Sequence, residues 1–256
     1  MARISDKAVV ERGARLADDV VVGAFAYVGA DVRVDRGCVI DSNATVLGRT
    51  TVGARTHIFP LAVVGAAPPG ADDEGECTLG EANAIRELVT VYAGTDAPTR
   101  LGIDNLMMIG STVGAGATLG DHGIFANCTQ IREGAVIEDY VRSSAFPVVA
   151  PHVRVGAYTF INGYARVDRD VPPFAIVEGV PVRVRGVNAE NLRRCGFDDR
   201  DVRALKNAFR ELYGGAASDP ERRVVDRLQE QRDLNPHVRR LLDALAAGRS
   251  SGDAHV

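Results

Sequence analysis

The feature that most constrains this chain is an aliphatic residue repeated at every sixth position. Twelve such positions run from Leu101 to Val167, and all but Ser143 are apolar. A period of six matches neither the 3.6 residues of a helical turn nor the two-residue alternation of an ordinary strand. It is typical of hexapeptide repeats, which build a parallel β-helix.

The same period opens the chain, where eleven consecutive positions keep their phase. They are Ile4, Val10, Leu16, Val22, Val28, Val34, Ile40, Val46, Val52, Ile58 and Val64. Each group of six forms one short strand and a bend, and three groups close one triangular coil. A single group cannot bury its apolar side, so stability must come from stacking on residues eighteen positions before and after. We therefore expect a β-helix over residues 1–186.

Two segments interrupt the repeat. Residues 66–78 are small, acidic and rich in proline and glycine, and the period resumes at Leu79. An insertion into a regular solenoid must leave it as a loop, so we expect residues 66–78 to project from the prism. The loop is either a tolerated surface excursion or a flap over a site, and both interpretations stay open. The second break, Ala97–Arg100, is shorter.

The pattern changes again after Pro172-Pro173. Residues 174–185 are apolar and extended, and from Asn188 the apolar spacing becomes helical. Helices are predicted to begin at Asp198, near Pro220 and after Asn235. We expect a helical domain over residues 187–247 that covers the open end of the prism, followed by a disordered tail over residues 248–256.

Composition and charge narrow the classes of partner. The net charge is −4, so no nucleic-acid partner is expected. No apolar run approaches the roughly 18 residues of a membrane span, and the first residues lack the apolar core of a signal peptide. The cysteines lie far apart and no histidines show ligand spacing, which predicts free thiols in a reducing cytoplasm, no metal and no cofactor. The cysteines are Cys38, Cys77, Cys128 and Cys195.

Specific motifs appear beside the repeat. They are D-V-P-P at 170–173, G-V-N-A-E-N-L-R-R at 186–194, I-R-E-L-V-T-V at 85–91 and D-N-L-M-M-I at 104–109. Together they resemble the UDP-N-acetylglucosamine O-acyltransferases (LpxA) of lipid A synthesis, from Ser5 to about Gly214. The resemblance implies a left-handed parallel β-helix with a C-terminal α-helical cap, assembled as a homotrimer. It also implies transfer of a 3-hydroxyacyl chain from acyl carrier protein to the 3-hydroxyl of a UDP-linked glucosamine.

That reaction needs a general base for the sugar hydroxyl and donors for the oxyanion of the tetrahedral intermediate. By resemblance, the catalytic histidine of the family falls on Ala115, its neighbouring aspartate on Gly116 and a preceding histidine on Thr112. The oxyanion glycine falls on Glu133 and the histidine after it on Gly134. No catalytic residue of the family is therefore intact at these five positions.

Some family positions near the nucleotide are retained. By resemblance these are Asn188, Glu190 and Arg194, while a second arginine is replaced by Cys195. A histidine–glutamine pair associated with substrate has become Ala150-Pro151.

Other residues are candidates to replace the base. His122 is fourth in its group of six, whereas Ala115 is third, so we expect a solvated histidine on a different face. His152 is also fourth in its group, and we expect it to be exposed or to lie between subunits. Glu133 could act as a carboxylate base and Cys128 as a nucleophile, but a solvated turn residue and a small buried thiol are favoured.

Two functions from different classes remain. The first is a non-catalytic binding, scaffolding or regulatory homologue, with acyl carrier protein, a UDP-sugar or a paralogous acyltransferase as candidate partners. The alternative is an active acyl-carrier-protein-dependent O- or N-acyltransferase on a UDP-amino sugar with altered chemistry. Loss of a general base alone lowers the rate by about 10²–10⁴-fold. Because base, orienting carboxylate and oxyanion position change together, the first function is favoured.

Overall fold

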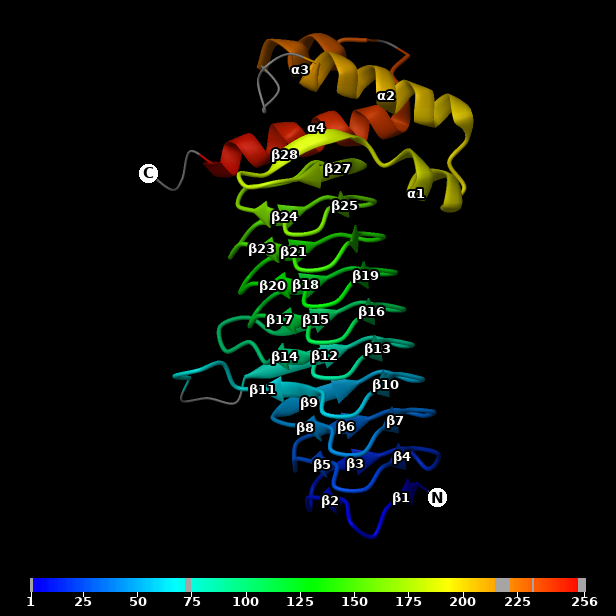
Figure 1. Ribbon diagram of the computed structural model, residues 1–256, viewed down its shortest axis with the longest axis vertical. Coiled ribbons are helices and arrows are strands. Elements are labelled where there is room, and N and C mark those ends of the chain that lie inside the picture. The colour runs from blue at the N-terminus through cyan, green and yellow to red at the C-terminus, as the bar shows by residue number, and fades with distance from the viewer. Residues whose placement is uncertain (1, 72–74, 215–221, 232, 253–256) are drawn as a thin grey trace.

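The protein is a left-handed parallel β-helix with an α-helical cap at its C-terminal end, seen in a computed structural model that describes residues 2–71, 75–214, 222–231 and 233–252 (Figure 1). Strands β1 to β26 wind in coils, and each strand from β1 to β23 pairs with the strand three places further along the chain. This pattern produces three parallel sheets, called A, B and C here.

Sheet A contains β1 (Arg3–Ile4), β4 (Val21–Val22), β7 (Val39–Ile40), β10 (His57–Ile58), β13 (Ala84–Ile85), β16 (Leu106–Met107), β19 (Ile124–Phe125), β22 (Arg142–Ser143), β25 (Phe160–Ile161), β27 (Ala175–Glu178) and β28 (Arg183–Val187). Sheet B contains β2 (Val9–Val10), β5 (Tyr27–Val28), β8 (Thr45–Val46), β11 (Val63–Ala66), β14 (Thr90–Tyr92), β17 (Thr112–Val113), β20 (Gln130–Ile131), β23 (Val148–Val149) and β26 (Arg166–Val167). Sheet C contains β3 (Arg15–Leu16), β6 (Arg33–Val34), β9 (Arg49–Val52), β12 (Glu76–Leu79), β15 (Thr99–Leu101), β18 (Thr118–Leu119), β21 (Val136–Ile137) and β24 (Arg154–Val155).

The repeated aliphatic residues fill the prism, and their predicted stacking is confirmed. Val22 pairs with Ile40, and Ile40 with Ile58, at a spacing of eighteen residues. Across the inserted loop the spacing lengthens, because Ile58 pairs with Ile85. These side chains are almost completely buried. The core is therefore a column of aliphatic layers, one layer per coil.

Ser143, the one polar residue of the late repeat, lies in this column at 6% exposure. Its Oγ accepts from the Ala126 backbone N–H at 3.1 Å and lies 2.8 Å from Thr129 Oγ1. In the adjacent coil its register partner is Phe125, one of the largest buried side chains. The small serine thus leaves room for the phenyl ring while its hydroxyl is satisfied locally.

The predicted loop at 66–78 meets strands at both ends. β11 continues to Ala66 and β12 begins at Glu76, so the segment that departs from the strands is 67–75, of which 72–74 lie outside the described residues. Figure 1 shows the described part of this segment leaving the prism between β11 and β12.

The cap consists of α1 (Ala189–Arg194), α2 (Asp199–Tyr213), α3 (Arg222–Gln229) and α4 (Pro236–Gly252). Asp198 caps α2 by accepting from the Asp201 N–H at 2.8 Å. The helix expected near Pro220 begins at Arg222, and residues 215–221 lie outside the described part. α4 continues past the predicted start of the tail at 248, and residues 253–256 are not described. Within the described residues, no helix combines the length and apolarity of a membrane span.

Three corners join the sheets, and we name each by the sheets it connects. At the C–A corner His122, Tyr140, Tyr158 and Phe174 form a continuous ring stack, with centroids 4.7, 4.9 and 5.8 Å apart. Phe197 of the cap packs edge-on against the last two of these rings. The cap is therefore anchored on the C–A corner.

Candidate functional site

The positions to which the resemblance assigns the family's catalytic residues lie together at the B–C corner. Ala115 and Gly116 form the turn between β17 and β18, and Glu133 and Gly134 form the same turn in the next coil. The Gly134 N–H donates to the Ala115 carbonyl at 2.9 Å, which fixes one turn on the other. Thr112 lies just before this turn, in β17. The geometry brings all five positions onto one corner of two adjacent coils.

Few ionisable side chains lie at this corner. Ala115 and Gly116 carry no ionisable group, and the Gly116 N–H donates to Thr99 Oγ1 at 2.8 Å. The Glu133 carboxylate is 50% exposed and lies 3.5 Å from Arg132 Nε. A carboxylate repels a developing oxyanion, so the Glu133 side chain opposes the stabilisation that a backbone N–H at this turn could provide.

His152 lies at the same corner, in the coil after Gly134. Its backbone N–H donates to the Glu133 carbonyl at 2.9 Å, and its side chain is exposed. Two coils separate its turn from that of Gly116, which corresponds to about 10 Å along the prism. The imidazole of His152 therefore cannot occupy the point that a side chain at Ala115 would reach. The sequence predicted that His152 is exposed or lies between subunits, and its side chain is exposed. Residues 116, 134 and 152 share one register at eighteen-residue intervals.

His122 lies elsewhere, at the C–A corner before β19. Its Nδ1 is 3.0 Å from Asp104 Oδ2, and its ring stacks on Tyr140. This imidazole is paired with a carboxylate, but it lies at a different corner from Ala115. Cys128 lies at the A–B corner, half-buried and with a free thiol.

The retained positions Asn188, Glu190 and Arg194 lie in and before α1. Asn188 is only 6% exposed, and its Nδ2 donates to the Tyr158 carbonyl at 2.8 Å, so its side chain also anchors the cap. Glu190 and Arg194 form an exposed ion pair one helical turn apart. Burial raises the pKa of the neighbouring Cys195 thiol, and the Arg142 guanidinium opposes that shift.

These retained residues and the B–C corner do not meet within one chain. α1 is held at the C–A corner by Asn188 and by Asn191, whose Nδ2 donates to the Tyr140 carbonyl at 3.2 Å. The vacated turns belong to the corner between β17 and β18 and its successor. A ligand that contacts both sets must therefore bridge two copies of the chain.

Arg142 is a polar residue near α1 that sequence reasoning missed. Its Nε is buried and has no hydrogen-bond partner within the described residues. No motif distinguishes this arginine, because it occupies an ordinary outward-facing strand position. Its proximity to Cys195 becomes visible only when α1 is packed on the prism.

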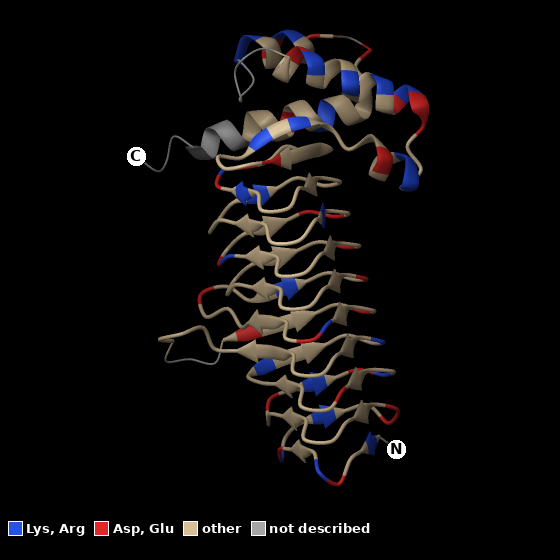
Figure 2. Ribbon diagram, viewed as in Figure 1, with Lys and Arg blue, Asp and Glu red and all other residues tan. Residues whose placement is uncertain are grey.

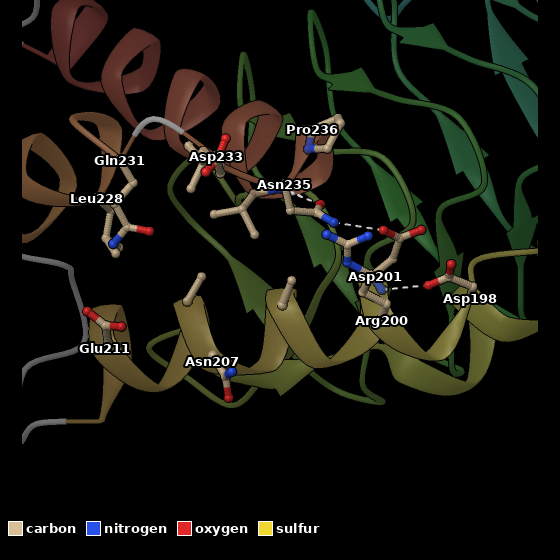
Figure 3. A pocket seen from close by; sticks show the side chains of 14 residues that line it. Asp198, Arg200, Asp201, Asn207, Glu211, Leu228, Gln231, Asp233, Asn235 and Pro236 are labelled. Atoms are coloured by element: carbon tan, nitrogen blue, oxygen red, sulfur yellow. Dashed lines mark hydrogen bonds between the residues drawn. The ribbon is translucent and has the colours of Figure 1, made fainter.

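A cavity of about 820 Å³ lies in the cap, between α2, the end of α3 and the start of α4 (Figure 3). Two of its polar side chains are bonded to each other, because Asn235 Nδ2 donates to Asp201 Oδ1 at 2.7 Å, and Glu211 pairs with Arg227 outside the lining at 2.9 Å. No group of three or more His, Cys, Asp or Glu side chains in the described chain could hold a metal ion. Charged residues of both signs are mixed over the cap (Figure 2). None of the predicted site residues lines this cavity.

Comparison with known proteins adds sequence and structural relatives. Residues 170–252 match the family model described as UDP-N-acetylglucosamine O-acyltransferase, domain 2. The chain is 36% identical over 248 residues to the acyl-[acyl-carrier-protein]–UDP-N-acetylglucosamine O-acyltransferase of Stenotrophomonas maltophilia, covering 94% of each chain. It is also 36% identical over 219 residues to the enzyme of the same name from Saccharophagus degradans, covering 83% of this chain and 85% of that protein.

Solved structures of UDP-N-acetylglucosamine acyltransferases are similar to this chain over nearly its whole length. The UDP-N-acetylglucosamine acyltransferase of Campylobacter jejuni superimposes with a TM-score of 0.87 at 28% identity, over 94% of this chain and 95% of that one. LpxA from Acinetobacter baumannii superimposes with a TM-score of 0.89 at 26% identity, over 95% of this chain and 96% of that one. With extensive identity, matching cap and matching prism, the chain belongs to the UDP-N-acetylglucosamine O-acyltransferase (LpxA) family.

Proposed function

We propose that this chain is a non-catalytic LpxA-family homologue that binds a UDP-amino sugar. The observation that carries the proposal is the B–C corner, where the family's base and orienting carboxylate are replaced by Ala115 and Gly116. The exposed Glu190–Arg194 pair on α1 supplies polar groups for a nucleotide. The relatives' names include acyl-[acyl-carrier-protein], so acyl carrier protein is a second candidate ligand.

We also propose that the functional unit is a homotrimer. A ligand contacting both the B–C corner and α1 has to lie between copies, and closed cyclic assemblies are the common form of homo-oligomer. Apolar residues exposed on the A–B corner favour association: Phe146 and Tyr164 stack at 5.1 Å and are 46% and 74% exposed. Light scattering should give three times the 27.2 kDa chain mass.

A mixed assembly with a histidine-bearing paralogue is a further partner proposal, because such a copy could supply the missing base at its own corner. We place the protein in the cytoplasm, since all four cysteines are free thiols and a reducing compartment keeps them so.

The decisive experiment offers purified protein a 3-hydroxyacyl carrier protein and UDP-N-acetylglucosamine and measures acyl transfer. We expect no turnover above background. The double variant Ala115→His, Gly116→Asp should gain activity, because Gly116 has φ +68° in a region that aspartate tolerates and a Cβ added there would have Ala97 O as its nearest neighbour, at 3.4 Å.

The matched control is Ala115→Gln, Gly116→Asn, which adds similar volume without a base. Robust transfer by the wild-type chain would overturn the non-catalytic proposal and favour the alternative of an acyltransferase with altered chemistry. Binding is tested separately: UDP-N-acetylglucosamine should raise the melting temperature of the wild type, and less so that of Arg194→Ala, because a ligand that binds only the native state stabilises it.

A further inference from the structure

Three consecutive coils place a left-handed residue at the same register of the B–C corner. Gly116, Gly134 and His152 have φ of +68°, +62° and +58°. Glycine adopts this conformation without strain, and histidine is among the few other residue types enriched in it. At this register the corner therefore has glycine in two successive turns and histidine in the third.

The imidazole of His152 lies directly over Gly134. A Cβ built on Gly134 would clash with His152 Nδ1 and would lie 2.6 Å from Cε1 and 3.3 Å from Cγ. The ring therefore fills the space in which a side chain at position 134 would begin. Because its Nδ1–Cε1 edge faces the glycine, Nε2 is on the more distant side of the ring.

Position 134 is where the family resemblance placed a histidine. This chain has glycine at position 134 and a histidine one coil further along the prism, at position 152. The ring of that histidine extends back over the turn at Gly134. An imidazole is therefore present beside Gly134 even though the sequence has glycine there.

The His152 ring also differs from the other described histidines in its contacts. His57 pairs with Asp41, His122 with Asp104 and His237 with Asp201. The side chain of His152 has no hydrogen bond, ion pair or ring contact with the described residues. It is exposed, so its nitrogen atoms are available to a ligand.

We propose that His152 is the ligand-contacting side chain of the B–C corner, where it hydrogen-bonds a polar group of the bound UDP-amino sugar. This inference rests on the proposed binding function and names the residue that serves it on the corner side. The contact is a binding contact: the ring has no carboxylate partner among the described residues and lies over Gly134, one coil from Gly116, so it is not oriented as a base for position 115.

The test measures binding of UDP-N-acetylglucosamine by titration calorimetry. His152→Phe keeps a ring but removes both nitrogen atoms, and Gly134→Ala introduces a methyl group that displaces the imidazole. The matched control is Gly37→Ala, at the C–A corner and with a similar φ of +69°, where the added Cβ would meet the Arg55 Cγ at 3.5 Å as an ordinary contact. Both glycine variants carry similar backbone strain, so only the displacement of His152 differs.

We expect the Kd to rise about 3- to 10-fold in His152→Phe and Gly134→Ala, the loss of one hydrogen bond to a ligand. Gly37→Ala should stay within about twofold of the wild type, and His152→Gln should recover part of the affinity through its side-chain amide. If Gly134→Ala does not fold, as judged by circular dichroism, the two His152 variants decide the question.

Unchanged affinity in His152→Phe would overturn the assignment of His152 and leave the proposed binding function standing. Unchanged affinity in a folded Gly134→Ala would overturn the requirement for the ring to lie over Gly134. Absence of binding by the wild type would overturn both this inference and the proposed function. That result differs from one in which the wild type and His152→Phe bind equally well, which would overturn this inference alone.

Discussion

A ladder of buried amide side chains holds the C–A corner together, and it gives a sharp test of what stabilises the prism. Asn83 and Asn105 precede β13 and β16 and are almost completely buried. Asn105 Nδ2 donates to the Gly120 carbonyl at 3.0 Å, and its Oδ1 accepts from the Gly123 N–H at 2.8 Å. Its own N–H donates to Asn83 Oδ1 at 3.0 Å, which links the two rungs.

The substitution Asn105→Ala leaves two backbone groups without their partner, the buried Gly123 N–H and the half-buried Gly120 carbonyl. An unsatisfied buried group destabilises a protein by about 1–3 kcal/mol. Counting the buried N–H in full and discounting the carbonyl, we expect the free energy of unfolding to fall by about 2–4 kcal/mol. That is a large part of the roughly 5–15 kcal/mol that stabilises a typical native protein.

Urea unfolding followed by circular dichroism measures this loss, with the m-value checked for constancy. The control is Asn207→Ala, which removes an amide from an exposed helical position and should change stability by less than about 0.5 kcal/mol. A double-mutant cycle with Asn83→Ala should be non-additive, because the backbone N–H of Asn105 donates to Asn83 Oδ1 and loss of the Asn105 side chain frees that backbone to shift. A loss below about 1 kcal/mol for Asn105→Ala, at constant m-value, would refute the view that the ladder is structural.

Three shorter predictions follow. Arg15 and Arg33 lie in register on adjacent strands of sheet C, so Arg33→Glu should raise the unfolding free energy by about 0.2–1 kcal/mol in low-salt urea melts, and by less in about 1 M salt. Burial raises the pKa of the Cys77 thiol to about 12, above that of an unfolded thiol, so the stability contributed by the neutral thiol is lost as pH rises from about 9 towards 12. Between about pH 8.5 and 10, the unfolding free energy of the wild type should fall by about 1–2 kcal/mol more than that of Cys77→Ala. Asp198→Ala removes the N-cap of α2 and should lower the unfolding free energy by about 1 kcal/mol in the same urea assay.

The six-residue period was sufficient to predict the prism, because each aliphatic position has only one way to be buried. That Ala115, Gly116, Glu133 and Gly134 stand where the family has its catalytic groups comes from the resemblance, which aligns the family's motifs with this sequence, and it stays a prediction. The grouping of these positions on one corner follows from the eighteen-residue register, because Ala115 and Glu133, like Gly116 and Gly134, lie eighteen positions apart. The inserted segment changes the register only further upstream, where Ile58 pairs with Ile85 and not with a residue eighteen positions later. That shift could be placed only after the ends of β11 and β12 were known.

Other features needed three-dimensional packing. The position of the His152 ring over Gly134 depends on a side-chain rotamer, and no sequence pattern specifies it. The docking of α1 at the C–A corner depends on Asn188 reaching the Tyr158 carbonyl, thirty residues earlier in the chain. The sequence marks Asn188 as a nucleotide residue by resemblance, while the structure shows that the same amide anchors the cap.

The eighteen-residue register of the coils also determines how this chain can change in length. Removing eighteen residues from a regular part of the prism, such as 23–40, would shorten it by one coil and leave every remaining side chain on its original corner. Removing six would rotate everything on the N-terminal side by about a third of a turn relative to the cap. Insertions and deletions in the prism therefore rotate the upstream coils relative to the cap. Only a change in length by a whole number of coils keeps each upstream residue on its original face.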